Sequence, residues 1–294
     1  MRLLCIHAHY DDFEFVAAGT FELMRRRALP GFQSKLLVCT DGKAGHHFRP
    51  REETGRVREA EQARSAAIGQ YAFETLTRRD GSRVREACMT LDTETMAALW
   101  KSVRDFQPDF IVAPPVASDP LAGIHIDHVT VAEAVRKLAY MINVPHAFSP
   151  EYPTDETKSV WIKTPVILNP YDAYMAGENA FDLAISVEAA FDLIAEMTWQ
   201  HQSQIVEWIP WIARHHMPES KDFGEWKKTL RARYVWQNRE LGIPSEDAYE
   251  YFTVTAWGAV PALEELLAAF PFIDQANSKL DSLQKRLKRW RGGA

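Results

Sequence analysis

Short apolar runs alternate with longer amphipathic segments over residues 2–142. Four apolar runs predict β-strands, at residues 3–8, 35–40, 71–77 and 109–113. Apolar positions at helical spacing predict helices at about residues 15–27, 54–68, 93–106 and 129–141. Runs that are apolar throughout, such as Phe110-Ile111-Val112-Ala113, suit parallel strands covered on both faces. We therefore predict an α/β fold, with a three-layer α/β/α (Rossmann-like) arrangement around a mostly parallel sheet.

The pattern becomes irregular after Asn143, where several prolines interrupt the chain. Further strands are predicted at residues 160–162, 166–168 and 182–185, followed by a helix from about 188 to 205. Residues 208–249 then carry tryptophans among charged residues, which predicts a helical, Trp-rich layer that packs most of its indole rings onto the core. These tryptophans are Trp208, Trp211, Trp226 and Trp236.

The last apolar pattern lies in the tail. Leucines and a tryptophan recur there at 3-4-3 spacing with basic residues between them, which predicts an amphipathic helix. The apolar positions are Leu280, Leu283, Leu287 and Trp290. We expect this helix to dock onto the body of the protein or onto a neighbouring subunit. In the second case the protein would be a homo-oligomer.

Composition narrows the class of protein further. The chain has 294 residues, enough for one large α/β domain, and its net charge of −6 gives no support for nucleic-acid binding. No apolar run approaches the length of a membrane span, and the apolar start is too short for a signal-peptide core. Two of the three cysteines, Cys5 and Cys39, fall in predicted strands, so no disulfide framework is indicated. We expect a cytoplasmic protein.

Two polar clusters follow two of the predicted strands. His9-Tyr10-Asp11-Asp12 comes after the run at 3–8, and His125-Ile126-Asp127-His128 comes after the run at 109–113. Ligands of an open α/β sheet collect beyond the carboxyl ends of its strands, so we expect the two clusters to meet there. His9, Asp12 and His128 would then hold a divalent metal with one position open for water, most simply Zn²⁺, with Fe²⁺ as the other candidate.

The remaining residues of the clusters suit the chemistry around such a metal. Asp11 is not needed as a ligand and is free to accept a proton from water as a general base. His125 could face the opposite side of a substrate, where as imidazolium it would stabilise an oxyanion or protonate a leaving amine. Asp127 is placed to hold a histidine in the required tautomer. Asp11-Asp12 alone is also typical of a helix N-cap. His7, on the same strand face as His9, is interpreted as a core residue or as a residue that supports a metal ligand. The other histidines are interpreted as ordinary core or surface residues, namely His46, His47, His146, His215 and His216.

Together with shorter motifs, the clusters resemble those of the LmbE/PIG-L-like zinc-dependent deacetylases, which act on N-acetylglucosamine-containing molecules. That family opens with His-Pro-Asp-Asp-Glu, which His9-Tyr10-Asp11-Asp12 matches apart from the proline, and His125-x-Asp127-His128 matches its second metal motif. The shorter matches are Gly19-Thr20, the loop at 40–45, Arg58 with Glu61, Asp80-Gly81, His201-Gln202-Ser203-Gln204 and Glu250-x-Phe252.

The resemblance spans about residues 3–252, so it implies a deacetylase domain at 1–252 and a C-terminal helical extension at 253–294. It implies hydrolysis of an acetamide on an amino-sugar substrate, with release of acetate. The metal ligands, the base Asp11 and the transition-state stabiliser His125 correspond to the family's residues. By the same resemblance Arg58 and Asp80 meet the substrate, and Lys43 lies in a loop that faces it.

Three residues depart from the family pattern. Tyr10 replaces the proline, Phe13 stands where the first motif has glutamate, and Lys43 replaces a glutamate of the substrate loop. These departures motivate one alternative, a catalytically inactive sugar-binding protein of the same fold. A mononuclear Fe(II) oxygenase is a second alternative, although such enzymes usually use a β-sandwich. One of the tryptophans at 208–236 could also serve as an aromatic wall for a sugar ring.

Overall fold

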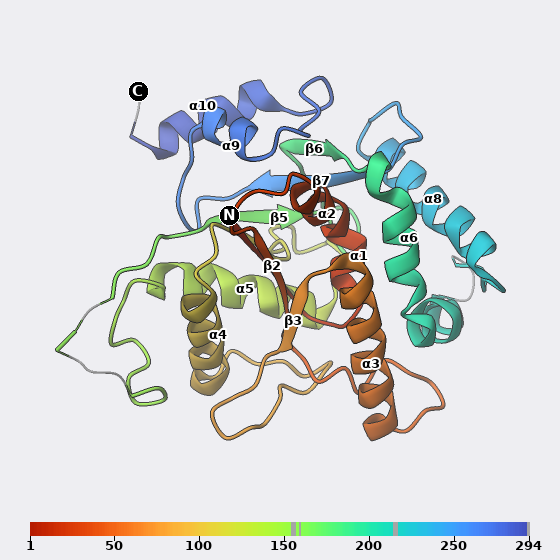
Figure 1. Ribbon diagram of the computed structural model, residues 1–294, viewed down its shortest axis with the longest axis horizontal. Coiled ribbons are helices and arrows are strands. Elements are labelled where there is room, and N and C mark those ends of the chain that lie inside the picture. The colour runs from red at the N-terminus through yellow and green to blue at the C-terminus, as the bar shows by residue number, and fades with distance from the viewer. Residues whose placement is uncertain (154–156, 159, 214–216, 293–294) are drawn as a thin grey trace.

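A seven-stranded sheet forms the centre of the computed structural model, which describes residues 1–153, 157–158, 160–213 and 217–292 (Figure 1). The strand order is β3-β2-β1-β4-β5-β7-β6. The strands are β1 (Arg2–His7), β2 (Gln33–Val38), β3 (Ala72–Thr75), β4 (Phe110–Val112), β5 (Val166–Pro170), β6 (Leu183–Ser186) and β7 (Tyr249–Val254). β1 to β5 pair in parallel, and β7 pairs antiparallel with β5 and β6. The predicted α/β fold with a mostly parallel sheet is confirmed.

Helices cover both faces of this sheet (Figure 1). They are α1 (Asp12–Val16), α2 (Ala18–Arg26), α3 (Arg51–Gly69), α4 (Thr93–Phe106), α5 (Ile126–Met141), α6 (Phe191–Trp199), α7 (Ile209–Ala213), α8 (Phe223–Glu240), α9 (Leu263–Ala269) and α10 (Leu280–Trp290). A 3₁₀ turn, η1 (Glu188–Ala190), precedes α6, and a π-helical turn, η2 (Ser203–Trp208), precedes α7.

The side chains of β1 show why two helical layers are needed. Leu3 and Cys5 belong to one buried apolar cluster, which α2, α6 and α8 complete, whereas Leu4 and Ile6 belong to a second cluster completed by α4 and α5. Successive side chains of a strand point to opposite faces, so a strand that is apolar throughout must be covered on both.

The register of the sheet brings the two histidine clusters together. β1 lies between β2 and β4, and its Leu4 pairs with Lys35 on one side and Ile111 on the other. Because β1 and β4 are parallel neighbours, the loops that leave their carboxyl ends lie side by side. The first of these loops carries His9, and the second leads to the start of α5.

Two predicted elements are interrupted in the structure. The helix expected at 15–27 is divided into α1 and α2 at Ala17, whose backbone leaves the helical conformation at φ −149°. The helix expected at 188–205 is divided into η1, α6 and the π-helical η2.

One predicted strand is wrong and one strand was missed. Residues 160–162 form no strand, because the side-chain amide of Asn143 pairs with both the N–H and the carbonyl of Ile162, at 3.0 and 2.9 Å. The unpredicted β7 contains Glu250, which interrupts its apolar pattern yet is buried. Glu250 accepts the N–H groups of Gly19 and Thr20 at 2.7 and 2.8 Å. The predicted domain boundary after residue 252 falls inside this strand, and the division into two units stays a prediction.

The tryptophans and the tail only partly follow the prediction. Trp226 is 1% exposed and its Nε1 donates to Thr198 Oγ1 at 2.8 Å, but Trp211 and Trp236 keep 41% and 46% of their surface exposed. Core packing therefore holds for Trp226 and does not hold for Trp211 and Trp236, so it does not extend to most of the four. The amphipathic tail is α10, whose Leu283 and Leu287 are buried against the same chain. No helix in the described ranges is both long and apolar enough to cross a membrane. His215 and His216 lie outside the described residues.

Candidate metal centre

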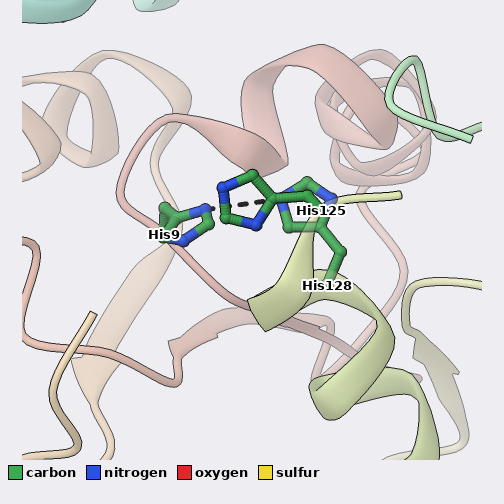
Figure 2. Close-up of side chains that lie close together, drawn as sticks. All are labelled: His9, His125 and His128. Carbon is green, nitrogen blue, oxygen red and sulfur yellow. Dashed lines mark hydrogen bonds between the residues drawn. The ribbon is translucent and has the colours of Figure 1, made fainter. Parts of the chain in front are cut away.

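The two histidine clusters meet at the carboxyl edge of the sheet (Figure 2). β1 ends at His7, and the chain turns sharply before α1, with Asp11 in the left-handed region at φ 93°. A non-glycine residue in this region is strained, and such strain is found preferentially at functional sites. From the second loop, His125 caps α5 and places His128 in its first turn.

The three predicted ligands face one another at distances that suit a metal. His9 Nδ1 lies 3.2 Å from Asp12 Oδ2 and 3.3 Å from His128 Nε2, and His128 Nε2 lies 3.4 Å from Asp12 Oδ1. Tetrahedral zinc with bonds of about 2.0–2.1 Å needs donor atoms about 3.3–3.4 Å apart. This donor set therefore fits a divalent ion. His125 and His7 also approach it, since the sets His9–His125–His128 and His7–Asp12–His128 each bring their donor atoms within 4.8 Å.

His9 and His128 each contact a buried carboxylate through the ring nitrogen that faces away from the predicted metal site. His9 Nε2 lies 3.0 Å from Asp127 Oδ2, and His128 Nδ1 lies 2.8 Å from Asp172 Oδ2. A carboxylate accepts an N–H, so these contacts place the proton on the far nitrogen of each ring. The opposite nitrogens, His9 Nδ1 and His128 Nε2, are then free to bind a cation. Asp127 thus lies where the sequence predicted a tautomer-fixing residue.

Asp172 is a member of this site that sequence reasoning missed. It lies just beyond the carboxyl end of β5, where the rule that located the first two clusters also applies. A carboxylate soon after a predicted apolar strand was the available signal. Its Oδ1 accepts the N–H of Tyr174, whose ring lies 5.2 Å from that of His128.

The electrostatics of the centre favour a cation. Burial alone would raise the pKa of Asp12, but His7, His128 and His9 hold it well below its usual range. Burial opposes protonation of His9 and His128, but neighbouring carboxylates outweigh it. Asp12 and Asp127 raise the pKa of His9 to about 9. Asp12 and Asp172 raise the pKa of His128 to about 10. Without a metal, protons on His9 and His128 balance the negative charge of the neighbouring carboxylates. A divalent ion would replace those protons.

The predicted base, Asp11, lies beside an arginine that bridges two carboxylates. Arg58 Nη2 contacts Asp11 Oδ1 at 3.3 Å, while its Nη1 donates to Glu86 Oε1 at 2.7 Å. Burial raises the pKa of Asp11 to about 6 against the opposing effect of Arg58. A carboxylate with a pKa near neutrality is suited to general-base chemistry. Glu86, also missed from the sequence, comes within 3.9 Å of His9 Nε2.

His125 packs against both His9 and His128. Its ring centroid is 4.7 Å from those of both His9 and His128, and its Nδ1 accepts the N–H of Asp127 at 3.3 Å. Burial, with the two neighbouring histidines, lowers the pKa of His125 to about 4. The ring is therefore neutral near pH 7 and carries its proton on Nε2, so the imidazolium form predicted from the sequence is wrong.

The predicted substrate residues are not gathered at one place. Arg58 is buried within the centre, at 2% exposure. Asp80 lies on an exposed turn and accepts the N–H of Ser82 at 2.8 Å, and Lys43 Nζ pairs with Glu52 at 2.6 Å. Within the described part of the chain, no hydrogen bond or ion pair joins Asp80 or Lys43 to the histidine cluster. Their substrate roles stay predictions.

The shorter motifs form the framework around the centre. Ser203 donates from its backbone N–H and its hydroxyl to Glu61, at 2.9 and 2.6 Å, and so ties η2 to α3. His201 Nε2 lies 3.3 Å from Glu14 Oε1, with both side chains fully buried. These contacts tie α3 to η2, and α1 to the residues just before η2.

Comparison with known proteins places this geometry in context. Residues 4–139 match the family described as "PIG-L: GlcNAc-PI de-N-acetylase". Among curated proteins, no sequence match to the chain is found.

Several solved structures share the fold. The N,N'-diacetylchitobiose deacetylase from Pyrococcus horikoshii is similar at a TM-score of 0.64 and 17% identity, over 87% of this chain and 84% of that one. GalB, the 4-carboxy-2-hydroxymuconate hydratase from Pseudomonas putida KT2440, is similar at a TM-score of 0.59 and 16% identity, over 86% and 95%. A conserved protein from Thermus thermophilus is similar at a TM-score of 0.57 and 19% identity, over 86% and 93%. A deacetylase and a hydratase thus share one scaffold, so the reaction must be argued from the site.

Proposed function

The chain carries a PIG-L (LmbE-like) family domain, and on this premise we propose that it is a metal-dependent N-deacetylase. The family supports N-deacetylation in general. Our finer proposal is hydrolysis of the N-acetyl group of an N-acetylglucosamine-containing small molecule or glycoconjugate in the cytoplasm. One observation carries it: His9, Asp12 and His128 face one another at 3.2–3.4 Å beside the buried carboxylate of Asp11.

The three facing residues would hold the ion, most simply Zn²⁺, with Fe²⁺ compatible with the same donors. When bound, a divalent ion supplies Lewis-acid activation for amide hydrolysis. Asp127 and Asp172 keep the two imidazoles in the tautomer that can bind it.

Asp11 carries the transferred proton, and His125 stabilises the charge that develops on oxygen. Asp11 accepts a proton from the attacking water as the new C–O bond forms. Neutral His125 donates a hydrogen bond from Nε2 to the developing oxyanion. The proton that Asp11 took from water passes to the nitrogen as the C–N bond breaks, so acetate and the free amine result and Asp11 is again a carboxylate.

The departures from the family pattern leave this machinery intact. Tyr10 is fully buried, and its hydroxyl pairs with Thr75 Oγ1 at 2.6 Å. Phe13 packs in the core, with its ring 4.7 Å from that of Tyr71. Both residues therefore serve packing, and neither displaces a metal donor or the base. This weakens the motivation for an inactive sugar-binding protein.

Released acetate, measured together with metal content on the same sample, tests the proposal. We expect the zinc-loaded protein to release acetate from at least one member of a panel of N-acetylated sugars. His128→Ala should lose most of the metal and the activity, whereas His146→Ala, on an exposed segment, should lose neither. Full metal content with no acetate from any amino sugar would favour the sugar-binding alternative. Metal retained by His128→Ala would contradict the ligand assignment.

A further inference from the structure

His125 is held in the metal centre by fewer polar contacts than the two histidines beside it. His9 and His128 each meet a buried carboxylate, at 3.0 and 2.8 Å. Among the described residues, the side chain of His125 makes one hydrogen bond, in which its Nδ1 accepts the N–H of Asp127 at 3.3 Å. This distance is longer than that of a typical hydrogen bond. The direction in which His125 Nε2 points therefore depends on how the ring is packed.

Three aromatic rings pack against His125. Its centroid lies 4.7 Å from those of His9 and His128 (Figure 2), and 5.1 Å from that of Tyr174 with the planes 65° apart. Tyr174 also packs on His128, at 5.2 Å and nearly perpendicular. Aromatic pairs favour such edge-to-face arrangements at these distances. Of the three rings, Tyr174 is the one that is not a predicted metal ligand.

The segment that carries Tyr174 is itself fixed by hydrogen bonds. The N–H of Tyr174 donates to Asp172 Oδ1 at 2.8 Å, while Asp172 Oδ2 meets His128. Asn179 Nδ2 donates to the carbonyls of Asp172 and Met175, at 3.0 and 3.1 Å. The backbone at Tyr174 is thus tied to the same carboxylate that orients His128.

A backbone pair joins this segment to the loop that leads to His125. The N–H of Gly123 donates to the carbonyl of Ala176 at 2.9 Å, and the N–H of Ala176 donates to the carbonyl of Gly123 at 3.1 Å. Gly123 lies two residues before His125, and Ala176 lies two residues after Tyr174. The pair therefore sets how closely the two side chains approach each other.

The ring of Tyr174, and not its hydroxyl, makes the contact with the histidines. Its hydroxyl has no hydrogen bond to another residue in the described part of the chain, whereas its ring contacts both imidazoles. The side chain is 51% exposed, so a substitution there leaves the apolar core undisturbed. This combination allows the effect of the ring to be measured separately from the stability of the fold.

We propose that Tyr174 is a positioning residue for His125, and that its ring holds the imidazole so that Nε2 points toward the developing oxyanion. This inference rests on the proposed function, in which His125 donates that hydrogen bond. Misplacing a catalytic group by about 1 Å costs about 10²-fold in rate, so a packing contact of this kind has a measurable effect.

Kinetics on variants of Tyr174 test this role in the zinc-loaded protein. Tyr174→Leu removes the ring but keeps an apolar side chain, and Tyr174→Ala is the second variant in case the first fails to fold. We expect kcat for acetate release to fall about 10–10²-fold with KM unchanged, because the oxyanion exists only in the transition state. Tyr174→Phe keeps the ring and should retain most of the wild-type rate. Zinc content should stay constant, since Asp172 is bound by the backbone of Tyr174.

Tyr140→Ala is the matched control, because Tyr140 is 84% exposed near the end of α5, the helix that begins beside His125. It should leave kcat and KM unchanged. An equal loss of rate in Tyr174→Phe and Tyr174→Leu would overturn the proposal, because the hydroxyl would then be the acting group. So would an unchanged kcat in Tyr174→Leu, or a loss of zinc from that variant that accounts for its loss of rate.

A spectroscopic measurement separates this proposal from the proposed function. In zinc-loaded protein labelled with ¹⁵N-histidine, two-bond ¹H–¹⁵N spectra report which ring nitrogen of His125 carries the proton, and His125→Ala assigns the signals. We expect the Nε2–H tautomer in wild type and Tyr174→Phe. Tyr174→Leu should show a mixture of tautomers, because a ring that is free to turn exposes both nitrogens to water.

The two proposals then fail in different ways. The expected tautomers without acetate release from any amino sugar would support the positioning role and contradict the deacetylase function. A single Nε2–H tautomer of His125 in Tyr174→Leu would overturn the positioning role, even where wild type releases acetate.

Discussion

Asp127 and Asp172 decide which ring nitrogen His9 and His128 leave free to bind a metal ion. Asp172 accepts from His128 Nδ1 at 2.8 Å and is buried, at 4% exposure. We predict that Asp172→Asn weakens zinc binding about 10–100-fold, as loss of such a hydrogen-bond partner generally does. Competition with a chromogenic chelator measures this affinity. Asp80→Asn is the matched control, since Asp80 is an exposed carboxylate on a separate turn, and equal affinities in the two variants would refute the role of Asp172.

Asp11 gives a second prediction at the residue scale. Its carboxylate lies beside the donor set but pairs with Arg58, so Asp11→Asn should keep the metal. Its rate should fall about 10²–10⁴-fold, because the base is lost while the fold and the ligands remain. Metal analysis and acetate release on one preparation check both halves. Near-full activity in a fully loaded variant would remove Asp11 from the mechanism.

At the scale of elements, a buried ion pair joins α1 to the segment between α6 and η2. His201 lies 3.3 Å from Glu14, and although burial opposes protonation, Glu14, Asp11 and Glu61 raise the pKa of His201 above its ordinary 6.5. A raised folded-state pKa stabilises the fold fully below pH 6.5, and this stabilisation is lost as pH rises through the folded-state value. We therefore predict that the stability advantage of wild type over His201→Gln shrinks between pH 6 and pH 9.

Urea unfolding of both proteins across this range measures that advantage as a free energy of unfolding. The comparison with His201→Gln removes the contribution of other titrating groups, because both proteins share them. A difference that stays constant, or that grows toward pH 9, would show that His201 does not bind its proton more tightly in the folded state.

At the scale of the whole molecule, the donor set connects segments 119 residues apart, from the end of β1 to the start of α5. An ion that binds only the folded chain at 100 times its Kd stabilises it by about 2.7 kcal/mol. For a chain of this size that corresponds to a rise in Tm on the order of 5 °C. We predict such a rise on adding zinc to chelator-treated protein, its loss in His128→Ala and its retention in His146→Ala. Differential scanning fluorimetry gives the result, and an equal shift in His128→Ala would place the ion elsewhere.

Local patterns in the sequence were enough for the parallel core and for the meeting of His9, Asp12 and His128. Apolar runs identify buried strands, and the carboxyl ends of parallel strands share one edge, so residues that follow two neighbouring strands must approach each other. The same local signals were too weak for β7, because the buried Glu250 breaks its apolar pattern while satisfying two N–H groups of α2.

Only the tertiary structure decided what surrounds the three predicted ligands. Asp172 reaches His128 across 44 residues, and Glu86 reaches Arg58 across 28, through contacts between separate elements that no sequence period records. His47, in the loop before α3, likewise stacks on Trp211 of α7 with ring centroids 4.7 Å apart. Glu207 of η2 contacts His46 of the same loop at 2.7 Å. Donors at strand ends follow from chain topology, whereas partners that orient them depend on packing between distant segments, and packing is a property of the folded chain alone.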